Sequence, residues 1–120
     1  MKDRLKILFE NNVIDKDVYE KCINLREGYM SENNLVSYNA YTVFMTHVAM
    51  ALNRIKSNNI VGELDDFILN EIKSDEEFNF VENETSKIKA LLNSDIPDSE
   101  MQYFWLHYLN ILRERRESND

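Results

Sequence analysis

Glycine and proline are almost absent from this chain. Among 120 residues there are two glycines, Gly28 and Gly62, and one proline, Pro97. A sheet protein of this size needs many tight turns, and tight turns depend on glycine and proline. Their scarcity therefore predicts long helices joined by short polar loops. The length is typical of one domain and suffices for one hydrophobic core, so we expect residues 1–120 to form a single domain.

Apolar residues recur at steps of three and four, which is the spacing of one face of a helix. The pattern is clearest in residues 41–55, where it begins with Tyr41, Phe44, His47 and Val48. In chain order, helices are predicted near residues 5–9, 15–28, 41–55, 64–72, 75–92 and 97–112. This pattern predicts five or six helices packed as a bundle, so we expect an all-α fold.

Several helix ends have recognisable signals. Asp15 has the character of an N-cap for the second helix, which fades between Gly28 and Asn34, where polar residues cluster. Ser74 or Asp75 is the expected N-cap of the fifth helix, with an acidic residue early in its first turn.

The charge of the chain opposes binding to nucleic acid. The formal net charge is −8, whereas a protein that binds phosphates along a nucleic acid needs a basic face. The nearest approach to one is Arg113, Arg115 and Arg116, interrupted by Glu114. Cations in the last turn of a helix are favoured by the helix dipole, which accounts for them without a ligand. We expect no direct contact with nucleic acid.

The single cysteine, Cys22, lies in a helical pattern and is interpreted as a small buried hydrophobic residue. The first twelve residues contain no apolar stretch of the length found in signal peptides, and no segment reaches the length of a membrane span. We therefore expect a cytoplasmic protein that does not contact a membrane, in agreement with an unpaired cysteine.

Only two histidines are present, and a charged residue lies seven positions from each. Arg54 follows His47, and Glu100 precedes His107. Seven residues make nearly two helical turns, so each pair shares one helix face, with a drift of about 20°. The rise of about 1.5 Å per residue places the partners too far apart for direct contact along a straight helix. Arg54 is therefore expected to meet a group from a neighbouring helix or subunit.

A neutral imidazole nitrogen can attack phosphorus and take up a phosphoryl group, and an arginine can bind the resulting phosphate oxygens. The competing interpretation is that each histidine is a packing residue on an apolar helix face. Around His107, the aromatic residues Tyr103, Phe104, Trp105 and Tyr108 are typical of a core.

A metal-dependent enzyme built in a helical bundle is a third possibility. Neither a Glu-x-x-His nor a His-x-x-x-His spacing occurs, since Phe44 and Phe104 stand three residues before the two histidines. We expect no metal, no cofactor and no catalytic residue.

Two segments resemble a known family. Residues 47–54, HVAMALNR, are similar to the H-x-x-x-A-x-x-R helix of the phosphotransferase-system (PTS) regulation domains, which occur in bacterial antiterminators and activators of sugar-uptake genes. Residues 96–109, IPDSEMQYFWLHYL, resemble the family's second histidine helix, where an acidic residue stands seven positions before the histidine. Residues 64–93 look like the linking helices. The resemblance covers residues from about 16 to about 113.

This resemblance implies a compact bundle of about five helices, commonly dimeric. It implies that His47 and His107 accept phosphate from the histidine-containing phosphocarrier protein or from a sugar permease component. Arg54 and Glu100 match accompanying family positions with a structural or electrostatic role. The implied function is regulatory, not enzymatic: phosphorylation modulates transcription or a partner protein through altered association, as a homodimer or as a heterodimer with another regulator.

Family members usually carry paired copies of the domain next to a nucleic-acid-binding domain, whereas this chain has room for one copy. We therefore expect a regulatory module that acts through a partner. The alternative is a helical protein–protein interaction module that is not phosphorylated.

Overall fold

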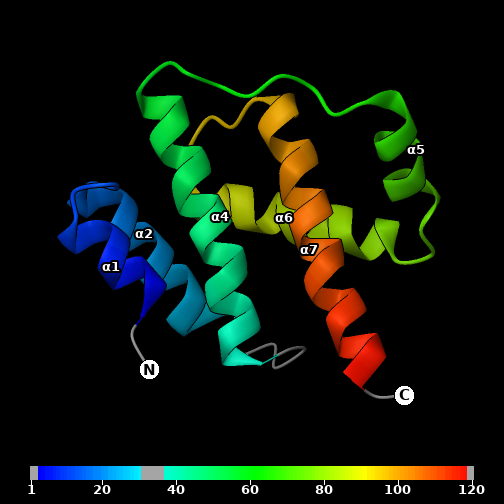
Figure 1. Ribbon diagram of the computed structural model, residues 1–120, viewed down its shortest axis with the longest axis horizontal. Helices are drawn as coiled ribbons and strands as arrows, with labels where there is room; N and C mark the ends of the chain where they lie inside the picture. The colour runs from blue at the N-terminus through cyan, green and yellow to red at the C-terminus, as the bar shows by residue number, and fades with distance from the viewer. Residues whose placement is uncertain (1–2, 31–36, 119–120) are drawn as a thin grey trace. The chain divides into compact units, whose positions relative to one another are not determined.

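The computed structural model describes residues 3–30 and 37–118, with side chains described as far as residue 114. Within these residues there are six α-helices, one π-helical turn and no strand, which confirms the all-α prediction with one helix more than about five (Figure 1). The helices are α1 (Arg4–Glu10), α2 (Lys16–Leu25), α4 (Tyr38–Lys56), α5 (Asp66–Ser74), α6 (Phe78–Leu92) and α7 (Asp98–Ser118), with the π-helical turn η1 (Arg26–Met30). They form two compact units, residues 1–59 and 60–120.

In the first unit, α1, α2 and η1 pack against one another and against α4 (Figure 1). Phe9 of α1 stacks on Tyr19 of α2, with ring centroids 4.6 Å apart. At the start of α2, Lys56 of α4 donates to Asp15 and Asp17, at 2.9 Å each. The buried apolar side chains come from all four elements and from the loop between α1 and α2: Leu5, Ile14, Val18, Cys22, Leu25, Met30, Tyr41, Phe44, Met45, Val48, Ala49 and Leu52.

Short acceptor side chains begin each helix of this unit. The carboxylate of Asp15 accepts from the backbone N–H of Val18 at 2.8 Å, which confirms the predicted N-cap of α2. Asp3 caps α1 and Ser37 caps α4 in the same way. Each side chain satisfies a backbone donor that the first turn of a helix leaves without a partner. The predicted fading of the second helix begins earlier than Gly28, because η1 follows Leu25 directly; residues 31–34 lie outside the described ones.

Asparagine takes the place of glycine where the chain turns back on itself. Asn12, Asn58 and Asn93 have φ angles of 60°, 57° and 51°, in the left-handed region. Asparagine tolerates this region better than most residues that have a Cβ. At the end of α4, the N–H of Asn59 donates to the carbonyl of Arg54 at 2.8 Å, as in a helix-terminating turn. In the described part of the chain, all three residues with positive φ are asparagines, and neither glycine has a positive φ.

A buried arginine joins the elements of the first unit. The side chain of Arg26 is 2% exposed. It donates to both oxygens of Asp3, at 3.0 and 2.7 Å, and to the hydroxyl of Thr42 at 3.0 Å. Its Nε donates to Glu27 at 3.1 Å, and its guanidinium carbon lies 4.8 Å from the centre of the Tyr38 ring. The start of α1, the turn η1 and the first turn of α4 are thereby held together.

In the second unit, α5 and α6 pack against α7. Trp105 of α7 meets Phe78 of α6 edge to face, with ring centroids 5.2 Å apart. Arg113 approaches Asp75, ahead of α6, at 3.4 Å. The buried apolar side chains include Ile72, Val81, Ile88, Leu92, Ile96, Met101, Phe104, Tyr108, Leu109, Ile111 and Leu112.

The predicted cap of the fifth helix is wrong. The helix α6 begins at Phe78 with Glu77 at the N-cap position, and no side chain caps it. Asp75 instead accepts from the N–H of Glu77 at 2.9 Å, within the turn that precedes the helix. An aspartate that bonds the backbone two residues on makes a turn of its own and competes with helix formation, so the helix starts later than the motif indicated.

None of the described helices combines the length and the apolar character needed to cross a membrane.

Candidate functional site

His47 lies in the middle of α4, at the edge of its buried face. The residues that flank it on that face, Phe44, Val48 and Ala51, are at most 2% exposed, whereas His47 is itself exposed. The side chain of His47 is therefore accessible beside the buried face of α4. A group in this position can be reached by a partner protein and is still held in place by its helix.

Three influences lower the pKa of His47. The largest is burial of part of the ring, followed by the positive charges of Arg54 and Arg4. Each disfavours the imidazolium form, because burial removes water from a charge and a neighbouring cation repels another. The lowered pKa favours the neutral ring, in which one nitrogen carries a lone pair in place of a proton.

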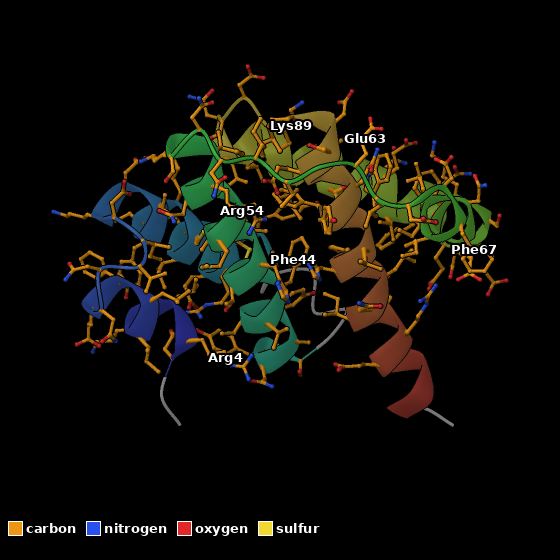
Figure 2. All side chains as sticks on the ribbon, turned by 45° about the horizontal axis from the view of Figure 1, so that its top comes forward. Arg4, Phe44, Arg54, Glu63, Phe67 and Lys89 are labelled. Atoms are coloured by element: carbon orange, nitrogen blue, oxygen red, sulfur yellow. The ribbon has the colours of Figure 1, made fainter. Side chains whose placement is uncertain are left out.

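Arg54 and Arg4 come from different helices. Arg54 is half-buried near the end of α4, and Arg4 is exposed in the first turn of α1. In Figure 2, Arg4 lies beside the first turns of α4 and Arg54 lies toward its other end. The sequence pattern identified Arg54 but not Arg4. Arg4 stands 43 positions before the histidine, and no spacing rule links positions so far apart.

Arg26, a third arginine of this unit, is bound to neighbouring side chains and does not act on His47. Its guanidinium is buried and bound to Asp3, Glu27 and Thr42. The hydrogen bond and charge of Arg26 in turn hold the pKa of Asp3 below its usual value. Burial raises the pKa of Cys22, nearby in α2, to about 12, so its thiol stays protonated and unreactive.

His107 lies in α7 and is half-buried. Its neighbours along the helix, Phe104 and Tyr108, are each 1% exposed, so this part of the aromatic cluster belongs to the core. Tyr108 also meets Phe80 of α6, with ring centroids 6.3 Å apart. His107 is thus more enclosed than His47, and a partner reaches it less easily.

Glu100 is fully buried in the first turn of α7. Its carboxylate accepts from the backbone N–H of Val61 at 3.3 Å. Two residues further along α7, the side chain of Gln102 accepts from the N–H of Leu64 at 2.9 Å. These two acceptors bind the backbone of the segment that leads into α5. Glu100 therefore has a structural role. The sequence did not single out Gln102.

The structure places His47 and Arg54 on α4, and Glu100 and His107 on α7, as the helical spacing predicted. Their roles in phosphorylation stay predictions. In the part of the chain that the structure describes, no group of three or more His, Cys, Asp and Glu side chains is arranged to hold a metal ion.

Comparison with known proteins identifies the family. A family model described as the PRD domain matches residues 20–111, well over half of the chain. Comparisons with curated proteins and with solved structures gave no match. The matched range contains both histidines, Arg54 and Glu100, and leaves α1 outside. The chain belongs to the PRD family, the regulatory domains of the phosphotransferase system.

Proposed function

We propose that this domain responds to phosphorylation of His47 and His107 by the sugar phosphotransferase system. The phosphate donor is the histidine-containing phosphocarrier protein or a sugar permease component. The output is a change in association, as a homodimer or as a heterodimer with another regulator, which modulates transcription or a partner protein. The domain acts in the cytoplasm. It contacts neither a membrane nor nucleic acid, and it catalyses no reaction of its own.

The observation that carries this proposal is the state of His47. The residue is exposed, and its pKa is lowered by partial burial and by Arg54 and Arg4. A neutral, accessible imidazole is the form that attacks phosphorus. Neighbouring cations favour the neutral ring before phosphoryl transfer and the phosphate dianion afterwards. A histidine that serves only in packing does not require such cations.

The two histidines lie in units of very different charge. Residues 1–59 contain eight Lys and Arg against seven Asp and Glu, and residues 60–120 contain six against fifteen. A phosphoryl group adds a charge of about −1.5 to −2 at pH 7. On His47 the added charge lies in the unit that has slightly more cations than carboxylates. On His107 it lies in the strongly acidic unit. We therefore propose opposite effects, with phosphorylation ordering contacts at His47 and weakening contacts at His107.

The test is phosphotransfer from the natural relay. The wild-type chain is incubated with phosphoenolpyruvate, the PTS kinase and the phosphocarrier protein, and each histidine peptide is analysed by mass spectrometry under alkaline conditions. We expect phosphohistidine at position 47, position 107 or both, and a change in molar mass by light scattering. A wild-type chain that carries no phosphohistidine after complete phosphorylation of the carrier would rule the proposal out.

A second candidate function is the interaction module that is not phosphorylated. Large apolar side chains are exposed in the second unit: Phe67 is 70% exposed and Leu91 is 56% exposed. Phe67 points outward from α5, and Glu63 lies in the segment that precedes this helix (Figure 2). Exposed apolar groups set among acidic residues are typical of a surface that docks a basic protein.

The two candidates differ in what the histidines do. In the interaction module, His47→Ala and His107→Ala lower the melting temperature, and treatment with the phosphorylated carrier leaves the molar mass unchanged. In the phosphorylation switch, the carrier changes the molar mass of the wild type and does not change that of the double variant.

A further inference from the structure

We propose that α1 of one copy of this chain docks on α5 of a second copy, through a basic face on α1 and an acidic face on α5. Each face has a large apolar side chain at its centre. The contact adds an interface to the homodimer of the proposed function, and it does not depend on phosphorylation of either histidine.

The outer face of α5 is centred on an apolar side chain. Phe67 is 70% exposed and points outward from the helix (Figure 2). Asn70, Glu71 and Ser74 follow it at three, four and seven positions and are also exposed, so they share its face of the helix. The buried face of α5 is carried by Ile72, which is 2% exposed. Packing within the second unit therefore leaves Phe67 uncovered.

Carboxylates are concentrated around Phe67 in the chain. Residues 63–77 contain seven Asp and Glu against one Lys. Glu63, Asp66 and Glu71 are exposed, and none of them forms an ion pair with another described residue. An exposed apolar group among carboxylates attracts a basic protein surface, and the carboxylates repel the phosphates of nucleic acids and anionic membranes. The face of α5 therefore fits a protein surface that combines cations with an apolar side chain.

The exposed face of α1 has this composition. Ile7, in the middle of the helix, is 38% exposed. Arg4 stands three positions before it, on the same face, and Lys6 stands directly before it. Both cations are exposed, and the helix has a single carboxylate, Glu10, at its end. The outer face of α1 thus presents one apolar side chain and two cations.

The other described cations of the first unit are engaged or enclosed. Arg26 is buried and Arg54 is half-buried. The lysines outside α1 bind carboxylates: Lys16 with Glu20, Lys21 with Asp17, and Lys56 with Asp15 and Asp17. In contrast, Arg4 and Lys6 form no ion pair with a described carboxylate. The basic surface of the first unit is therefore concentrated on α1.

A second copy of the chain supplies the basic face wherever the acidic face is present. α1 belongs to the first unit and α5 to the second, and Ile7 and Phe67 are both exposed in the single chain. Because the two faces differ, the contact is heterologous, with α1 of one copy on α5 of the next. In this contact Ile7 and Phe67 are removed from water, and Arg4 and Lys6 meet Glu71 and its neighbouring carboxylates.

The experiment reverses one charge on each face. Lys6→Glu and Glu71→Lys are measured separately and as an equimolar mixture, without a phosphate donor, by sedimentation velocity over a wide range of protein concentrations. Lys16→Glu and Glu82→Lys are the matched controls, because they make the same charge changes at exposed positions of α2 and α6. Circular dichroism checks that every variant is folded.

We expect the wild type to self-associate, more weakly as salt is added, and each single reversal to raise the dissociation constant about five- to tenfold. The mixture should regain the affinity of the wild type, because every contact then joins faces of opposite charge. The two control variants should associate as the wild type does.

A second pair of variants tests the apolar centre. Phe67→Ser should raise the dissociation constant about tenfold or more, since a large apolar side chain no longer leaves water on association. Leu91→Ser is its control, because Leu91 is 56% exposed on α6, outside the proposed contact, and its loss should have little effect on association.

A wild type that stays monomeric at every concentration would overturn the contact and would leave the face of α5 to another basic protein. Single reversals that associate as tightly as the wild type, or a mixture no tighter than the single variants, would overturn it as well. None of these outcomes affects the phosphotransfer test of the proposed function, which is made on the histidines.

Discussion

Arg26 and Asp3, 23 positions apart, form two parallel hydrogen bonds, from Nη1 to Oδ1 at 3.0 Å and from Nη2 to Oδ2 at 2.7 Å. Because the Arg26 side chain is 2% exposed, loss of its partner leaves a buried charge poorly compensated. We predict that Asp3→Asn lowers the free energy of unfolding by about 2 kcal/mol, since Glu27 and Thr42 still bind the guanidinium. Urea unfolding followed by circular dichroism measures this change.

The control is Glu10→Gln, which removes an exposed carboxylate from the other end of α1. Its effect should stay within about 0.5 kcal/mol, as for most surface substitutions. Equal stability of Asp3→Asn and the wild type would show that this pair does not anchor α1.

Acid should destabilise the first unit through its aspartates. The pKa of Asp3 is lowered by the hydrogen bond from Arg26, and that of Asp15 by the N–H of Val18 and by Lys56. Folded values below the unfolded value of 3.8 mean that these carboxylates add stability above about pH 4, and that this stability is lost as the pH falls through the folded values. Urea unfolding between pH 6 and pH 2.5 tests this, and the Asp3→Asn variant should show a shallower decline.

The charge of Arg54 should be detectable at His47. A cation disfavours the imidazolium, so Arg54→Gln should raise the pKa of His47 toward its ordinary value of 6.5. Lys56→Gln, two residues on in the same helix, is the control, because Lys56 binds Asp15 and Asp17 and does not act on the histidine. An NMR titration in which both variants match the wild type would contradict the charge arrangement described above.

The hydrogen bond that the side chain of Gln102 accepts should contribute to the free energy of unfolding. Its side chain is 8% exposed and accepts from the N–H of Leu64, so Gln102→Ala leaves a buried donor without its partner. The expected loss is about 1–2 kcal/mol. Asn110→Ala, at an exposed position of the same helix, should have little effect. Thermal melting followed by fluorescence of Trp105, the single tryptophan, compares the two. A loss in Asn110→Ala as large as in Gln102→Ala would argue against this role.

Periodicity predicted the parts of the fold that depend on local sequence. Apolar spacing identified the helices, and the short side chain of Asp15 identified the start of α2, because an N-cap acts on the backbone two or three residues away. The scarcity of glycine correctly indicated helices. It did not show that Asn12, Asn58 and Asn93 adopt the left-handed conformation, because asparagine is also common in ordinary loops.

The contacts that sequence could not predict join residues far apart in the chain. Arg26 and Asp3 carry no pattern in common, and neither do Gln102 and Leu64. Spacing rules place residues on the face of a single helix and say nothing of how two helices meet. For the same reason, spacing did not identify Arg4. The sequence pattern placed Arg54 on the helix face of His47, and only the packing of α1 on α4 adds a second cation.

The most direct test of the account is a ³¹P NMR spectrum of the intact domain after incubation with phosphoenolpyruvate, the PTS kinase and the phosphocarrier protein. We predict resonances in the phosphohistidine region in the wild type that disappear on acidification and are absent from the His47→Ala, His107→Ala double variant. The same resonances in the double variant, or none in the wild type beside a fully phosphorylated carrier, would contradict the account.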